Sequence, residues 1–396
     1  MRWRLLLASV VLVAGCSAVP GPPDETPAPS PVPASTSAAP APSPTPTPTP
    51  TPEPEPACRA EAESLDLPER AGQLVMVGVE GPLDAAERRA ITGHHLGSVI
   101  LMGTSSRGVA RTADLTDSLQ DLADGIGLLV AVDQEGGAVQ RLRGAGFDRI
   151  PAAADQARLS EAKLTRQATG WGRQLAKAGV QLNLAPVADV VPRDNRSRNE
   201  PVAQLRRGYG SDPAKVSAHV GAFIAGMHAG GVGTAVKHFP GLGAVRGNTD
   251  FAEEVVDSET TATSPLLTPF ADAIEQGSDA VMVSSAIYRK IDPDRLATFS
   301  PVVIGLLREW GFDKVVISDD LGAAAALRAV PGKQRATRFV AAGGDLALSV
   351  DPQVAVAMAT GLVSRAEDDP DFAEQLTASA ARVLALKQAY GLVECR

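Results

Sequence analysis

Short runs of apolar residues recur along the chain from residue 74 onward, and stretches with helical periodicity separate them. The runs are rich in Val, Ile and Leu and show little alternation with polar residues, which is typical of parallel strands buried on both faces. The clearest helix is predicted over 213–228, where apolar side chains recur every three or four residues. Eight runs are predicted as strands: 74–79, 98–102, 128–132, 181–186, 234–238, 280–284, 314–318 and 345–348.

Eight strands that alternate with helices favour an α/β fold of the (β/α)₈ type, the TIM barrel. A doubly wound open sheet is the alternative. We expect residues 58–396 to form a single globular domain, because barrels of this length occur as one domain.

The N-terminus has the pattern of an export signal over residues 1–15. Arg2 and Arg4 precede an apolar run at 5–13, which is too short to span a bilayer and ends in small residues before Cys16. The small residues before Cys16 resemble the bacterial lipoprotein box, which implies cleavage before Cys16 and acylation of its thiol. A plain secretion signal is the alternative. We therefore expect an extracytoplasmic protein whose contact with the membrane is its lipid anchor.

The segment 16–57 is predicted to be a disordered linker. Sixteen of the 31 prolines of the chain lie between residues 17 and 57, a stretch without Lys or Arg. Such a composition supplies too little apolar surface to offset the entropy of ordering. After it, Cys58 and Cys395 remain as an even pair in an exported chain, which predicts a disulfide between the first and last elements of the barrel. Two free thiols are the alternative.

Charge and motif content exclude several classes of protein. The net charge of −9 and the lack of a basic cluster argue against nucleic acid as a partner. The scattered His and Cys residues do not have the spacing of a metal site, and no G-x-S-x-G motif is present. We expect no cofactor.

Charged residues follow several predicted strands at the end where barrel enzymes carry their chemistry. They include Asp133, Asp189, Lys237 and Asp319. Unpaired buried charges are costly, so their recurrence predicts a polar pocket rather than a purely structural core. Glycoside hydrolysis typically uses a pair of carboxylates, one as nucleophile and one as proton donor.

The segments at these strand ends resemble signature segments of glycoside hydrolase family 3, in particular its single-barrel exo-β-N-acetylglucosaminidases. The strongest matches are DQEGGAVQR at 133–141, KHFPG at 237–241 and SDDL at 318–321. Weaker matches are APVAD at 185–189, RGYGSDP at 207–213 and ATFSP at 297–301. The resemblance spans nearly the whole globular part, in order.

This resemblance implies roles for individual residues. Asp319 matches the nucleophile, and we expect nearby Lys237 to favour its ionised form. Residues matching the family's contacts to the terminal sugar are Asp133, Arg141, Arg207, Lys237 and His238.

The loop after the fifth strand departs from the family pattern. The relatives carry an Asp-Ser-His whose Asp-His dyad serves as acid and base, whereas this chain has Asn-Thr-Asp at 248–250. Asp250 is the candidate acid/base, with Glu253 and Glu254 in reserve. An Asp needs burial or a neighbouring carboxylate to hold a proton near neutral pH. Glycines at 241, 243 and 247 predict a loop that swings over the substrate.

These features predict a retaining exo-glycosidase that acts on a carbohydrate substrate, most simply terminal β-N-acetylglucosamine of cell-wall-derived glycans. Aromatic residues make up 4% of the chain, which favours a pocket for one terminal sugar over a long groove. Two alternatives remain: a catalytically silent barrel that binds wall sugars, and a family 3 enzyme with another sugar or acceptor preference.

Overall fold

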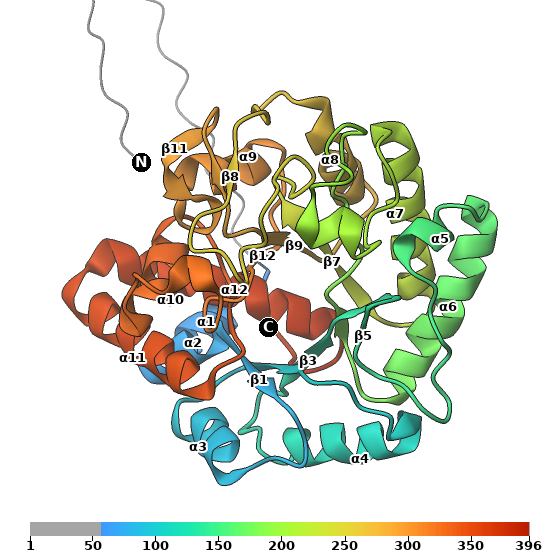
Figure 1. Ribbon diagram of the computed structural model, residues 1–396. Coiled ribbons are helices and arrows are strands. Elements are labelled where there is room, and N and C mark those ends of the chain that lie inside the picture. The colour runs from blue at the N-terminus through green and yellow to red at the C-terminus, as the bar shows by residue number, and fades with distance from the viewer. Residues whose placement is uncertain (1–56, 396) are drawn as a thin grey trace, which may run out of the picture. The chain divides into compact units, whose positions relative to one another are not determined.

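The computed structural model describes residues 57–395 (Figure 1). The predicted signal peptide over 1–15, the predicted acylation site at Cys16 and the Pro/Thr-rich segment up to residue 56 lie outside the described residues.

Eight parallel strands form the central sheet in the order β12-β9-β7-β6-β3-β2-β1-β13. A parallel bridge between Ile317 and Leu346 joins the two outer strands, so the sheet closes into a barrel. This closure confirms the (β/α)₈ prediction and excludes the open sheet. The strands are β1 (Val75–Val79), β2 (Ser98–Leu101), β3 (Leu129–Val132), β6 (Leu182–Asn183), β7 (Gly233–Phe239), β9 (Ala280–Val283), β12 (Val315–Ser318) and β13 (Ala347–Ser349).

Each predicted strand coincides with one of these eight, and the side chains alternate between two apolar cores. On β1, Val75 and Val77 pack outward against the helices, whereas Met76 packs inside the barrel. On β12, Val316 points outward and Ile317 inward. Because both faces are buried, both sets of positions are apolar, which is why the sequence shows so little polar alternation.

Helices surround the barrel (Figure 1). The predicted helix 213–228 is α7, which begins after its N-cap Asp212. The α-helices are α1 (Arg59–Ser64), α2 (Leu67–Gln73), α3 (Ala85–Gly93), α4 (Gly108–Gln120), α5 (Ala153–Gln156), α6 (Glu161–Lys177), α7 (Pro213–Ala229), α8 (Thr268–Glu275), α9 (Pro301–Glu309), α10 (Gly332–Ala341), α11 (Pro352–Asp368) and α12 (Pro370–Ala389). Shorter helical turns are η1 (Glu200–Gln204), η2 (Pro265–Leu267), η3 (Ala297–Phe299) and η4 (Ala325–Leu327).

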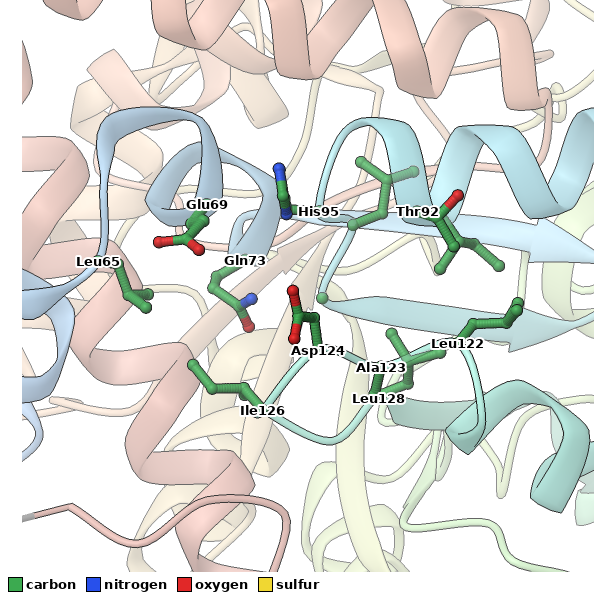
Figure 2. Close-up of a pocket in the computed structure, with 13 residues that line it drawn as sticks. Leu65, Glu69, Gln73, Thr92, His95, Leu122, Ala123, Asp124, Ile126 and Leu128 are labelled. Atoms are coloured by element: carbon green, nitrogen blue, oxygen red, sulfur yellow. The ribbon is translucent and has the colours of Figure 1, made fainter.

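The last helix, α12, closes the end of the barrel where the strands begin. Its Val383 and Leu386 join the apolar core inside the barrel. Its Lys387 is fully buried and donates a 2.5 Å hydrogen bond to Gln73, at the end of α2. At the same end, Gln73, Glu69, His95 and Asp124 line a pocket of about 280 Å³ (Figure 2).

Two small sheets lie at the opposite end of the barrel, where the barrel strands end. A hairpin directly follows β3, and a three-stranded sheet joins segments that follow β7 and β9. The hairpin strands are β4 (Gln134–Gly136) and β5 (Val139–Gln140), and the sheet strands are β8 (Val256–Asp257), β10 (Ile287–Tyr288) and β11 (Asp292–Leu296). These short strands were not predicted.

A disulfide joins Cys58, the N-cap of α1, to Cys395 near the end of the chain, as predicted, with a Cα–Cα distance of 5.2 Å. Within residues 57–395, no helix is both long enough and apolar enough to cross a bilayer.

Candidate active site

A pocket of about 600 Å³ opens at the end of the barrel where the strands finish. The structure brings all seven predicted site residues of the barrel together around it: Asp133, Arg141, Arg207, Lys237, His238, Asp250 and Asp319. They come from strand ends or loops that are far apart in the sequence. The barrel therefore gathers one polar site from separate segments, as its topology requires.

Lys237 and His238 are neighbours in the chain, and both line this pocket. Consecutive residues of a regular strand point to opposite faces. The pairing of β7 with β9 shifts register between Lys237 and Phe239, which interrupts that alternation.

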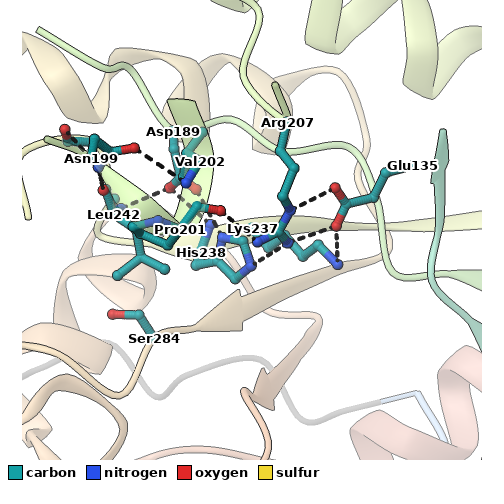
Figure 3. Close-up of polar contacts among 12 residues, drawn as sticks. Glu135, Asp189, Asn199, Pro201, Val202, Arg207, Lys237, His238, Leu242 and Ser284 are labelled. Carbon is teal, nitrogen blue, oxygen red and sulfur yellow. Dashed lines mark hydrogen bonds and ion pairs between the residues drawn. The ribbon is translucent and has the colours of Figure 1, made fainter. Parts of the chain in front are cut away.

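The floor of the pocket is a network of charged side chains centred on Glu135 (Figure 3). Arg207 binds the Glu135 carboxylate through two nitrogens, Nε at 2.9 Å and Nη2 at 2.7 Å. Lys237 Nζ lies 2.8 Å from the same carboxylate and 2.6 Å from Asp133 Oδ1. Arg141 Nη2 lies 3.9 Å from Asp133, and its Nε has no hydrogen-bond partner among the described residues. Glu135 thus holds two of the predicted sugar-binding cations.

Burial and charge act in opposite directions on this network. Burial opposes ionisation of Glu135, but Arg207 and Lys237 outweigh it and hold the pKa of Glu135 well below its usual range. Burial likewise opposes the charged form of Lys237, yet Asp133 and Glu135 raise its pKa. Each group is therefore ionised at neutral pH.

Asp189, which is fully buried, fixes the ring of His238 (Figure 3). Its Oδ2 lies 2.8 Å from His238 Nδ1, and its Oδ1 accepts hydrogen bonds from the backbone N–H groups of His238 and Leu242. His238 Nε2 lies 3.1 Å from Arg207 Nη2. Because arginine only donates, Nε2 accepts, and the single ring proton is on Nδ1. His238 is therefore neutral.

With His238 neutral, the charges of the pocket floor balance. The acidic members are Asp133, Glu135 and Asp189, and the basic members are Arg141, Arg207 and Lys237. A balanced set of ions is the arrangement in which burial costs least.

Asp319 follows the last residue of β12 and is half-buried in the pocket. Its Oδ1 accepts a 2.9 Å hydrogen bond from the backbone N–H of Asp320. Lys237, which we expect to favour the ionised form of Asp319, forms its ion pairs with Asp133 and Glu135. Among residues 57–395, Asp319 has no cationic nitrogen within 4.0 Å, so backbone rather than lysine supports its carboxylate.

Asp250 lies in the loop after β7 and lines the same pocket as Asp319. The backbone carbonyls of Thr249 and Asp250 accept 3.3 Å hydrogen bonds from the N–H groups of Ala326 and Ala325, in the loop after β12. Asp250 is exposed at the mouth, but the surrounding protein partly desolvates its carboxyl. Desolvation and the negative charge of Asp319 raise the pKa of Asp250, and the positive charge of Arg207 opposes this rise.

The root of this loop is pinned by two buried asparagines from the loop after β6. Asn199 Nδ2 donates to the carbonyls of Leu242, Gly243 and Val245, and Asn195 Nδ2 donates to two of the same three. A Cβ at Gly243 would lie 1.8 Å from the carbonyl oxygen of Val190. This glycine therefore permits close packing at the root of the loop.

The reserve acids Glu253 and Glu254 are exposed and do not line the pocket. Glu253 lies 3.6 Å from Arg328. Glu135 was assigned no role in the sequence analysis, which included it only within a motif. Its position two residues after Asp133, at the same strand end, could have indicated that it belongs to the site. Within the described part of the chain, no three His, Cys, Asp or Glu side chains converge as ligands for a metal ion.

An eight-stranded barrel with several carboxylates at its strand ends, set around a pocket with fixed cations, suits glycoside hydrolysis. A model of the glycosyl hydrolase family 3 N-terminal domain matches residues 66–386. The chain belongs to glycoside hydrolase family 3.

Relatives with known names agree with this assignment. A β-hexosaminidase of Pseudomonas aeruginosa (strain LESB58) is 32% identical over 302 residues, which cover 75% of this chain and 88% of that protein. The crystal structure of a β-N-acetylhexosaminidase from Beutenbergia cavernae is 45% identical, with a TM-score of 0.81, and the match covers 82% of this chain and 99% of that one. A family 3 β-N-acetylglucosaminidase from Paenibacillus is 32% identical, with a TM-score of 0.76 over 83% of this chain and 63% of that chain.

Proposed function

We propose that the protein is a retaining exo-glycosidase that removes terminal β-linked N-acetylglucosamine from cell-wall-derived glycans. The names of the relatives support the sugar. The observation that carries the mechanism is that Asp250 and Asp319 line one pocket together with Asp133, Arg207 and Lys237.

The floor of the pocket binds the hydroxyl groups of the terminal sugar. Asp133 and Lys237 line the pocket together, so one accepts and the other donates hydrogen bonds to neighbouring hydroxyls. Arg141, whose Nε has no protein partner among the described residues, and Arg207 complete the ring of donors. Both ring nitrogens of His238 are engaged by Asp189 and Arg207, so His238 acts by positioning Arg207.

Asp319 is the nucleophile. Its ionised carboxylate attacks the anomeric carbon as the bond to the leaving oxygen breaks, which forms a covalent glycosyl-enzyme. Asp250 gives its proton to that leaving oxygen. Asp250, now a carboxylate, then takes a proton from a water molecule, whose oxygen attacks the anomeric carbon and releases Asp319. Two displacements at one carbon retain its configuration.

Asp250 takes the acid/base role that the Asp-His dyad has in the relatives. A general acid must be protonated, and the raised pKa of Asp250 extends its protonated form to higher pH than an ordinary aspartate allows. The sign follows directly: activity falls as pH rises through the pKa of Asp250. Once Asp319 is glycosylated its charge is lost, so the pKa of Asp250 drops and suits it to act as the base.

The N-terminal sequence supports a place for this activity. Acylation of Cys16 and the Pro/Thr-rich segment after it would hold the domain outside the cytoplasm, anchored to the membrane by lipid and near wall fragments. Nucleic acid has no part in this function.

The test compares two substrates and three variants. Asp319→Ala abolishes hydrolysis of both 4-nitrophenyl β-N-acetylglucosaminide and the disaccharide of two β-linked N-acetylglucosamines. Asp250→Asn removes the fall in rate at high pH and lowers disaccharide hydrolysis by about 10²–10⁴-fold, while it spares the nitrophenyl substrate, whose leaving group needs no proton. Glu254→Gln, an exposed acid outside the pocket, is the control. Equal losses on both substrates for Asp250→Asn contradict its role as the acid, and failure of a 2-fluoro sugar to label Asp319 contradicts the nucleophile.

A further inference from the structure

Large exposed hydrophobic side chains are concentrated at the mouth of the pocket. Within residues 57–395 there are three: Phe251 with 82% of its surface exposed, Val302 with 50% and Leu205 with 41%. Two of them, Phe251 and Leu205, line the pocket. Single exposed apolar residues are ordinary, but two on the wall of one functional pocket indicate a surface that something covers.

The chain places Phe251 directly beside the candidate acid. Phe251 follows Asp250, and its backbone N–H donates a 3.1 Å hydrogen bond to the carbonyl of Asn248, which fixes the turn. The hydrogen bonds of Thr249 and Asp250 to the loop after β12 hold the same turn against the loop that begins at Asp319. A general acid must touch the leaving oxygen, so the side chain next to it lies on the leaving-group side of the cleaved bond.

Leu205 reaches the pocket from a different segment, the loop after β6. It directly follows η1, and Arg206 after it has a φ of 58°, which turns the chain sharply before Arg207. Arg207 then enters the ionic floor. The same short segment therefore contributes a cation to the floor and an apolar side chain to the wall.

We propose that Phe251 and Leu205 form a leaving-group subsite that packs against the C–H face of the sugar ring next to the cleaved bond. The proposal rests on the function proposed above and adds the class of leaving group. One face of a pyranose ring presents C–H groups, which suit the electron-rich face of an aromatic ring. The polar floor and the apolar wall thus divide the substrate: hydroxyls of the terminal sugar below, and the ring of the next sugar above.

The test separates substrates with and without a sugar as the leaving group. N-acetylglucosaminyl fluoride releases only fluoride and cannot reach the subsite, whereas the β-linked disaccharide fills it. Phe251→Ala lowers kcat/KM for the disaccharide by about fivefold to tenfold and leaves that for the fluoride unchanged, because only the disaccharide has a second ring that contacts Phe251. Phe251→Tyr keeps the aromatic face and restores the disaccharide rate. Leu205→Ala shows the same selectivity to a smaller extent.

Val302→Ala is the matched control, because Val302 is also a large exposed hydrophobic residue but lies on α9, outside the pocket. Thermal melting of each variant checks that the fold is retained. An equal loss on both substrates, or no loss on the disaccharide, overturns the subsite while the glycosidase function stands. If the wild-type protein hydrolyses neither substrate, the proposed function fails and the subsite fails with it.

Discussion

Replacement of Glu135 by glutamine tests whether the charged floor is built around this residue. Glu135 is buried and pairs with two cations at once, Arg207 and Lys237. The change keeps the shape of the side chain and removes its charge. The floor then changes from three acids and three bases to two acids and three bases, and one buried positive charge has no counterion.

The expected cost follows from that uncompensated charge. Breaking a buried ion pair by removing one partner costs about 3–5 kcal/mol of unfolding free energy. The pKa of Glu135 is lowered in the folded protein. Its contribution to stability is therefore complete above its unfolded pKa of about 4.3 and is lost as pH falls through the lower, folded value. The difference between wild type and Glu135→Gln is accordingly largest at neutral pH and shrinks in acid.

Urea denaturation followed by tryptophan fluorescence at pH 7 and at pH 3–4 measures this difference. Hydrolysis assays on the same samples should show kcat/KM reduced by about 10²-fold, because Arg207 and Lys237 lose the carboxylate that positions them. Glu254→Gln, which removes an exposed acid outside the pocket, should change neither quantity. A loss of less than about 1 kcal/mol together with unchanged kcat/KM would refute the reasoning.

Two further predictions concern the frame of the barrel. Burial lowers the pKa of Lys387 to about 7, so between pH 7 and 10.5 the unfolded chain binds a proton that the folded chain does not. The unfolding free energy of wild type relative to Lys387→Met should therefore rise across this interval, by up to about 5 kcal/mol, in denaturation experiments at a series of pH values. A difference that does not change with pH contradicts the burial argument. Loss of the disulfide in Cys58→Ser/Cys395→Ser should lower the unfolding free energy by about 3–5 kcal/mol, since the bond closes a loop with a sequence separation of 337. Reduced wild type should then match this variant, and a variant as stable as the oxidised protein contradicts the prediction.

The barrel strands were predictable because their burial on both faces leaves a direct record in the sequence. The match is weakest at 181–186, where the regular strand β6 covers only Leu182–Asn183. The small strands β4, β5, β8 and β10 have two or three residues each, too few for any periodicity to appear. Their pairing depends on loops that the barrel brings together.

The candidate site was predictable in its members and not in its connections. Each predicted residue stands at a strand end or in the loop that follows, so the topology alone gathers them. The partners of Lys237 are different: Asp133 and Glu135 lie about a hundred positions earlier in the chain, and only the three-dimensional structure shows that they, and not Asp319, receive its charge. The anchoring of the loop after β7 by Asn195 and Asn199 was hidden for the same reason.

The bond between Cys58 and Cys395 also determines how mechanical load enters the domain. Tension applied to the chain ahead of Cys58 reaches Cys58 itself, which is joined both to α1 and, through the disulfide, to the segment after α12. Peeling from one end is thereby blocked, because both ends must detach in the same event. A pull is shared between two helices that pack against each other, and the strands that shape the pocket lie inside the closed loop.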